Sequence, residues 1–259
     1  MTNNGTRANS ARVYEYILAG RTPGVPFTQA DIRMAEVIAE QHPNTVQGMH
    51  LHHLYIEVAA RAYHDAGIHH YIDIGAGLPT IGALHEFVED GDAILYVDQD
   101  AEAVAFGQQV LADRPHLRYM EAKLEMIEQI LAEAEQLFGD NRLVGVNLIS
   151  IAHFVDDEQL SRALGVLYDW AAPGSLVAVT STPGERTQGF QKASDEYKKS
   201  TGLSVYLRTP EEMVEVFRPW QPFVPPSGVE DQVEQMLGTT VAQNEYRGLL
   251  GYGGIFLKQ

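Results

Sequence analysis

The sequence predicts a doubly wound α/β protein built on a mostly parallel sheet. From residue 70 onward, short β-branched runs alternate with amphipathic helical segments, which is the pattern of βαβ units. A turn with two glycines directly follows the first of these runs, as it does at the ligand-binding edge of such sheets. The 259 residues are enough for one large domain of this kind.

The core of the fold is expected as five strands joined by four helices. The longest apolar run, 143–149, should be the central strand, because strands covered on both faces read as continuous hydrophobic runs. A glycine-rich strand closes the chain at 252–257. The expected core strands are 71–74, 93–97, 117–121, 143–150 and 175–180. The expected helices lie near 79–89, 100–112, 124–138 and 157–171.

Helical segments precede the first strand. Asn9 or Ser10 can cap a first helix that ends at Gly20. Thr28 with Asp31 resembles a capping box for a second helix. A longer third helix should run from about residue 45 to residue 66.

Three segments follow the fifth strand. Residues 186–201 are polar and have a helical pattern. The sequence Thr209-Pro-Glu-Glu212 predicts a helix start, with a threonine cap, a proline in the first helical position and a glutamate that reaches back. Residues 219–228 contain four prolines and are expected to be irregular.

The composition excludes several kinds of partner. Eighteen Lys and Arg against 35 Asp and Glu give a net charge of −17, and no window concentrates the basic residues, so nucleic acid is not an expected partner. The absence of cysteine excludes disulfides and thiolate metal sites. The most apolar window, 143–155, is too short and polar to span a bilayer, and residues 1–9 have no signal-peptide core. We therefore expect a cytoplasmic protein with no membrane partner.

The segment from His70 to Thr80 is the most informative in the chain. It places a strand, a glycine turn and a helix start in succession, so that backbone N–H groups face a ligand beyond the strand end. Gly75 and Gly77 permit a close backbone approach. Pro79 occupies the position of the third glycine of a dinucleotide fingerprint and is interpreted as the first residue of the helix.

Acidic residues indicate the kind of ligand. Asp98 ends the second strand 21 residues after Gly77, where an acidic side chain binds ribose hydroxyls. Asp73, inside the glycine motif, would repel a pyrophosphate but suits a ligand with an amino group. Asp73 and Pro79 thus disfavour a nicotinamide dehydrogenase, and the loop is expected to bind a nucleoside with positive charge.

With these motifs the sequence resembles the class I S-adenosylmethionine-dependent methyltransferases. It is more narrowly similar to a methyltransferase-fold family long catalogued as a domain of unknown function. The resemblance implies a Rossmann-like, seven-stranded, mostly parallel sheet with N-terminal helices and an antiparallel last strand. It runs from about residue 9 to the C-terminus and rests on segments 9–20, 73–80, 96–100, 153–157 and 251–254.

The resemblance also implies which residues hold S-adenosylmethionine. Asp73 would reach the amino group, and Gly75, Ala76 and Gly77 would line the methionyl part. Asp98 would accept from the ribose. Gln99, Lys123 and Leu124 would border the adenine, and Ser150 completes the set at the end of the fourth strand. Lys123 departs from the family pattern, because it stands near the usual acidic residue and a lysine cannot accept a hydrogen bond from the adenine amino group.

The first helix offers Arg12 and Tyr14 to the same site. In the resembling family this helix looks like a lid, and Arg12 could pair with the cofactor carboxylate. The alternative is an amphipathic helix on the sheet edge with Arg12 in solvent.

His153 is the expected catalytic residue. It lies just past the central strand, and its ordinary pKa suits a general base near neutrality. The alternative is a histidine bonded to a neighbouring loop. No metal site is expected, because the cluster His50-Leu-His52-His53 has no carboxylate at metalloprotease spacing.

Together these observations predict a methyltransferase of small molecules. Residues 1–67 would form a helical lid on a core of 68–259, with 186–235 as a variable insertion on the substrate side. Strand four ends in Ser150-Ile-Ala-His153, which lacks the Asn-Pro-Pro-Tyr type of motif, so O- or C-methylation is favoured over N-methylation of bases. A protein that binds the cofactor without methylating remains an alternative because of Lys123, and monomer and homodimer both remain open.

Overall fold

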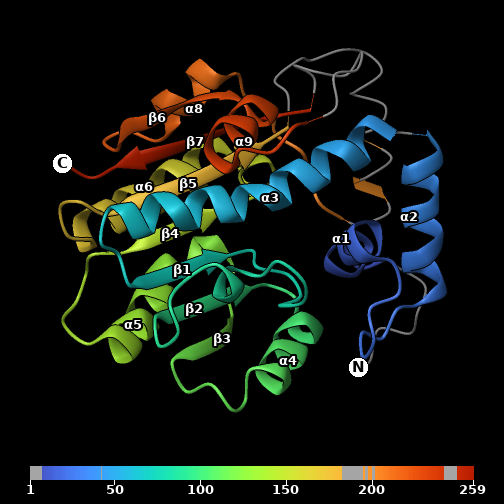
Figure 1. Ribbon diagram of the computed structural model, residues 1–259, viewed down its shortest axis with the longest axis horizontal. Coiled ribbons are helices and arrows are strands. Elements are labelled where there is room, and N and C mark those ends of the chain that lie inside the picture. The colour runs from blue at the N-terminus through green and yellow to red at the C-terminus, as the bar shows by residue number, and fades with distance from the viewer. Residues whose placement is uncertain (1–7, 42, 183–194, 196–197, 200–201, 242–249) are drawn as a thin grey trace.

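The computed structural model describes residues 8–41, 43–182, 195, 198–199, 202–241 and 250–259. It contains a seven-stranded sheet in the order β3-β2-β1-β4-β5-β7-β6 (Figure 1). The first five strands pair in parallel, and β7 pairs antiparallel with both β5 and β6. This confirms the predicted fold, with β4 in the middle. The strands are β1 (His70–Ile74), β2 (Ala93–Asp98), β3 (Leu117–Glu121), β4 (Gly145–Leu148), β5 (Leu176–Ser181), β6 (Gln221–Gly228) and β7 (Tyr252–Leu257).

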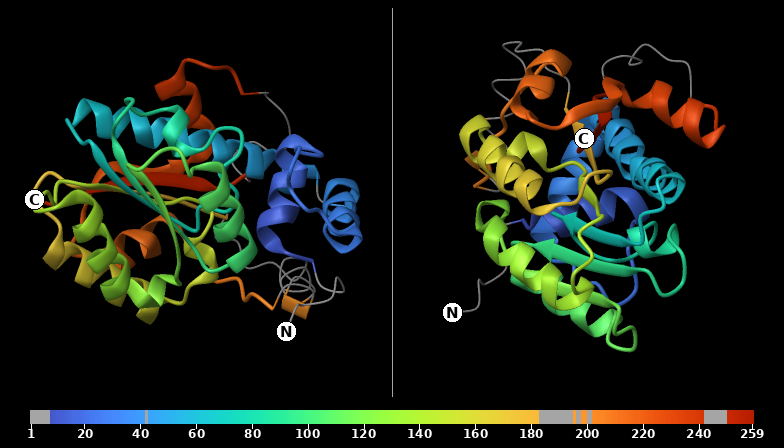
Figure 2. Two further views of the ribbon diagram at one scale, coloured as in Figure 1. Left: turned by 90° about the horizontal axis from the view of Figure 1, so that it is seen from below. Right: turned by 90° about the vertical axis from the view of Figure 1, so that its left-hand side faces the viewer.

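Helices cover both faces of the sheet, as Figure 2 shows. One core joins Ile72 and other strand residues to α5, α6 and α8, and a second core on the opposite face joins Tyr71 to α3, α4 and α9. Successive strand residues therefore enter opposite cores. The helices are α1 (Ser10–Ala19), α2 (Gln29–Gln41), α3 (Pro43–Asp65), α4 (Ala101–Val110), α5 (Ile127–Phe138), α6 (Asp157–Trp170), α8 (Pro210–Val216) and α9 (Val229–Leu237).

The predicted caps are present. The Asn9 side chain accepts from the N–H of Arg12 at 3.0 Å. Thr28 and Asp31 exchange hydrogen bonds across the first turn of α2, and Thr209 forms a capping box at the start of α8. The predicted helix at 186–201 lies almost entirely outside the described residues.

Two predicted elements were wrong. Residues 79–89 form only a single 3₁₀ turn, Leu84–Glu86, and Pro79 does not begin a helix. Gly82 has φ +73°, which a right-handed helix cannot contain. The expected irregular segment 219–228 contains β6. Its prolines are accommodated because β6 is an edge strand with irregular register.

The N-terminal helices lie at the carboxyl ends of the parallel strands. Figure 1 shows α1 and α2 together at this end, while α3 runs from there along the sheet. Within the described ranges, we find no helix with both the length and the apolar character needed to cross a membrane.

Candidate functional site

The glycine loop follows β1 directly and is tied to the end of β2. The N–H groups of Gly75 and Ala76 donate to the carbonyl of Val97 at 2.7 and 3.1 Å. Gly75 has φ +74°, and a Cβ atom there would lie 2.1 Å from Cγ2 of Ile151. The loop conformation and the close approach of Ile151 thus both require glycine.

Asp98 fixes the other half of the loop. Its Oδ2 accepts from the N–H of Gly77 at 2.9 Å, and its Oδ1 accepts from the N–H of Asp100 at 2.8 Å. Burial raises the pKa of this carboxyl, although these backbone hydrogen bonds oppose the shift. Each carboxylate oxygen can accept more than one hydrogen bond, so a ligand hydroxyl can share them.

Asp73 is a second buried carboxyl, on β1. Burial raises its pKa to about 7, the Asn147 side chain opposes the shift, and the charge of Asp98 adds to it. Neither Asp73 nor Asp98 forms an ion pair with a basic side chain of the described residues. The loop therefore borders two buried carboxyls that lack a counter-ion from this part of the chain, which is why burial raises their pKa values.

Helix α1 packs against this loop. A Cβ atom on Gly77 would lie 3.9 Å from Cβ of Ala11. The Asn9 amide donates to Asp100, and Thr80 donates to Glu15 at 2.5 Å. Helix α1 and its cap thus contact the glycine loop and the start of α4.

Arg12 is buried and paired within the protein. Its Nε donates to Oδ2 of Asp31 at 2.7 Å, and its NH1 group donates to Glu102. Burial opposes ionisation of Asp31, but hydrogen bonds from Asn9, Arg12 and Thr28 hold its pKa below the usual range. Arg12 therefore joins α1 to α2 and α4, and the alternative that placed it in solvent is wrong.

Tyr14 reaches the end of β4. Its hydroxyl donates to the carbonyl of Met49 at 2.9 Å and lies 3.4 Å from Oγ of Ser150. Burial raises the pKa of Tyr14 to about 12. Ser150 has φ +59°, a left-handed conformation that costs free energy in a residue other than glycine, and its N–H donates to Oγ1 of Thr180. A strained residue is thus held beside the glycine loop.

The expected adenine-binding residues lie at the neighbouring strand ends. The N–H of Ala122 donates to the carbonyl of Asp98 at 3.0 Å, which brings the ends of β2 and β3 together. Gln99 and Lys123 are exposed, and Leu124 is buried. Besides Asp98, the described residues of this edge offer an apolar side chain and backbone groups, but no further buried acidic side chain to accept from an amino group.

His153 lies in a 3₁₀ turn, Ala152–Phe154, just beyond β4. It is buried, and its Nδ1 has no hydrogen-bond partner among the described residues. Burial lowers its pKa to about 3, and His52 and Arg208 add to the shift. The ring is therefore neutral near neutrality, and its pKa does not suit the general base expected from the sequence.

Comparison with known proteins identifies the class to which this site belongs. The model of the S-adenosyl methyltransferase family matches residues 3–254. The chain belongs to this family. S-adenosylmethionine is therefore the cofactor of this methyltransferase, as predicted, and the nicotinamide alternative is excluded.

Solved structures agree with this assignment. The methyltransferase is similar to a candidate methyltransferase from Thermobifida fusca YX, with 24% identity, a TM-score of 0.84, and coverage of 98% of this chain and 96% of the other. It is also similar to a DUF574 family protein from Streptomyces avermitilis MA-4680, with 26% identity, a TM-score of 0.81, and coverage of 98% and 99%. The second match confirms the predicted resemblance to a family catalogued as a domain of unknown function. No curated protein matches the chain.

Sequence reasoning missed two buried side chains that lie close to the candidate site residues Asp73 and His153. Asn147 on β4 lies opposite Asp73 in the parallel register. Arg208, only 2% exposed, donates to the carbonyls of Ala152 and Val155 and so holds the turn that carries His153. No local pattern marks Arg208 as buried, because its partners lie more than 50 residues away. Asn147 lies within an apolar run that was predicted as a strand, and nothing in that run marked it as a site residue.

The histidines of α3 serve the fold. Nε2 of His52 lies 3.1 Å from the carbonyl of Leu250, and Nε2 of His53 lies 3.0 Å from that of Ile81. These contacts leave both imidazoles engaged with backbone groups. His50 is exposed.

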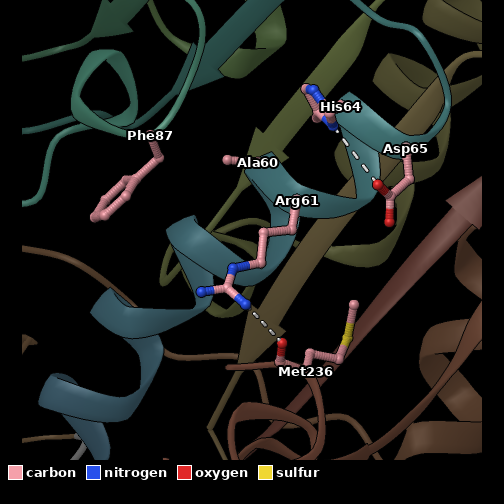
Figure 3. Close-up of a pocket in the computed structure, with 6 residues that line it drawn as sticks. All are labelled: Ala60, Arg61, His64, Asp65, Phe87 and Met236. Carbon is pink, nitrogen blue, oxygen red and sulfur yellow. Dashed lines mark hydrogen bonds and ion pairs between the residues drawn. The ribbon is translucent and has the colours of Figure 1, made fainter. Parts of the chain in front are cut away.

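Two further features lie near the other end of α3. An open hollow of about 500 Å³ is lined by Arg61, His64, Phe87 and neighbouring residues (Figure 3). The ligand atoms of His69, Glu89 and Asp92 lie within 4.8 Å of one another, but two of these residues are exposed. Both features are near the amino end of β1, whereas the glycine loop follows its carboxyl end.

Proposed function

We propose that this methyltransferase transfers the methyl group to oxygen or carbon of a small-molecule acceptor. The observation that carries the proposal is the position of α1 on the glycine loop. The cap residue Asn9 bonds to Asp100, and Arg12 bonds to Glu102. Glu15 accepts from Thr80, so α1 would cover the cofactor side of the loop. A helix that covers the site would exclude water, which suits a small molecule better than a macromolecular surface.

The residues of the loop fit the charge of the cofactor. The buried carboxyl of Asp73 lacks a cationic partner from the described residues, and the cofactor brings an ammonium group. We assign Asp73 to that group, with Gly75, Ala76 and Gly77 along the methionyl part. Asp98 would accept from the ribose while it continues to hold the N–H of Gly77.

The remaining cofactor contacts come from three elements. Gln99, Lys123 and Leu124 would border the adenine, with a backbone carbonyl in place of the missing acidic acceptor. Tyr14 and Ser150 would close the methionyl side, because they meet at the end of β4. Arg12 would act by positioning α1, because Asp31 and Glu102 already engage its guanidinium.

The chemistry of transfer belongs mainly to the cofactor. S-adenosylmethionine supplies an activated methyl group, and the protein aligns the acceptor and excludes water. We assign His153 to acceptor contact as a neutral imidazole, because its pKa of about 3 makes it too weak a base to take up a proton near neutrality.

A transfer assay tests the proposal. The purified chain is incubated with methyl-labelled S-adenosylmethionine and a metabolite extract, with parallel reactions containing protein or nucleic acid. We expect label in a small molecule as an ether or a carbon-bound methyl group. Label only in protein or nucleic acid, or only on nitrogen, would overturn the proposal, and so would tight binding of the cofactor with no transfer to any acceptor.

A further inference from the structure

Four buried polar side-chain atoms beyond the ends of β4 and β5 have no hydrogen-bond partner elsewhere in the described part of the chain, although the hydroxyls of Ser181 and Tyr252 interact with each other. The four atoms are Nδ1 of His153, Oγ of Ser181, Oγ1 of Thr182 and the hydroxyl of Tyr252. Each of these atoms is buried. Neither the glycine loop nor the proposed cofactor contacts use any of them.

The four residues form one cluster. Ser181 and Tyr252 are direct partners in the antiparallel pairing of β5 with β7, and Thr182 follows Ser181 in the chain. Arg208 donates to the carbonyl of Ala152, the residue before His153, and its charge lowers the pKa of both His153 and Tyr252. Ser150, beside the glycine loop, bonds to Thr180, the residue before Ser181.

The cluster needs a partner that the described residues do not supply. Buried polar groups in native proteins are almost always hydrogen-bonded, and several unpaired together are unusual. Arg208, which lies nearby, differs from them, because all three of its guanidinium nitrogens donate to acceptors within the protein. The unpaired atoms therefore indicate a ligand site rather than general poor packing.

The chemistry of the four atoms indicates the ligand group. Burial raises the pKa of Tyr252 to about 12 and lowers that of His153 to about 3, so both side chains are uncharged near neutrality. The three hydroxyls can donate or accept, and a neutral imidazole does one at each nitrogen. The nearby Arg208 is unfavourable for an ammonium group. An uncharged hydroxyl, which both accepts and donates, satisfies such a set.

We infer that His153, Thr182 and the Ser181–Tyr252 pair bind a hydroxyl group of the acceptor, which is therefore an alcohol or a phenol. This inference rests on the proposed transfer to a small molecule. The bound hydroxyl anchors the acceptor, whether or not it is the atom that is methylated.

Two isosteric variants, Tyr252→Phe and Thr182→Val, test the inference in the full chain. Tyr168→Phe is the matched control, because it removes a hydroxyl near the end of α6, where the ring contacts Lys258 beside the amino end of β5. The acceptor used is the small molecule whose methylated product carries the label in the transfer assay. The affinity for S-adenosylhomocysteine is measured separately by calorimetry. We expect the KM for the acceptor to rise tenfold or more in both variants, with unchanged S-adenosylhomocysteine affinity and no effect in the control.

Thermal melting without acceptor gives a second readout. Because the hydroxyl of Thr182 has no partner in the described part of the chain, Thr182→Val should melt at the same temperature as the wild type or above it. A lower melting temperature would mean that ordered water already satisfies the hydroxyl and would overturn the inference. An unchanged KM, or a labelled acceptor without a hydroxyl group, would overturn it as well. No labelled small molecule from the wild type would instead overturn the proposed function on which it rests.

Discussion

The N–H of Gly77 donates a 2.9 Å hydrogen bond to Oδ2 of Asp98 and thereby joins the glycine loop to the end of β2. The same carboxyl accepts from the N–H of Asp100, at the start of α4. Asp98 thus shapes the loop before any ligand arrives, and a ribose would meet a carboxylate whose orientation is already fixed.

Replacing Asp98 with Asn should weaken cofactor binding. An amide has one acceptor oxygen, and its NH₂ group would face a backbone N–H, so one of the two bonds is lost. We expect the Kd for S-adenosylhomocysteine to rise at least tenfold in calorimetry. The exposed Asp113→Asn serves as control, and equal affinities in the two variants would contradict the assignment.

Gly75→Ala should disrupt the loop. The variant adds about 1–3 kcal/mol of backbone strain at φ +74° and a contact of 2.1 Å with Ile151. Gly139→Ala is the matched control, because Gly139 has φ +65° with no atom within 4 Å of the Cβ position. Urea unfolding should show the larger loss for Gly75→Ala, and adding Ile151→Ala should recover part of it. Equal losses in both single variants would show that Ile151 has no role.

Arg12→Gln should loosen α1. The variant leaves Asp31, which is fully buried, without its cationic partner, and the loss of a buried pair costs about 3–5 kcal/mol. Glu102→Gln should cost far less, because the Glu102 side chain is 63% exposed. Urea unfolding measures both variants. A Glu102→Gln effect as large as that of Arg12→Gln would mean that Asp31 is not the principal partner.

His153 should remain neutral across the physiological pH range. Its pKa of about 3 lies well below that of an ordinary histidine, because burial disfavours the charged ring. Imidazole ¹⁵N NMR, with His153→Gln to assign the signal, should show no titration of His153 between about pH 5 and 8. A midpoint near 6.5 would restore the general-base role.

Short-range signals predicted well. The caps at Asn9, Thr28 and Thr209 act over three residues, so the sequence contains each complete interaction. The glycine loop and Asp98 were predictable for a related reason, because parallel strands bring their carboxyl ends to one edge of a sheet.

Long-range contacts explain what the sequence did not reveal. Arg12 pairs with residues 19 and 90 positions away, and no local pattern distinguishes those partners from other acidic side chains. The prolines of 219–228 indicated a loop, but that segment pairs with β7 as an edge strand. The lowered pKa of His153 likewise depends on burial beneath distant elements, which a sequence position near a strand end does not report.

The pH dependence of S-adenosylhomocysteine binding tests the central claim most directly, because this ligand carries the amino group assigned to Asp73. The pKa of Asp73 is raised to about 7 in the free protein, so below that pH the carboxyl must lose a proton before it can pair with an ammonium group. Calorimetry between about pH 5.5 and 8.5 should therefore show affinity that falls as the pH drops below about 7, and weak binding without this dependence in Asp73→Asn. Equal affinity and an identical pH profile in the wild type and Asp73→Asn would contradict the account.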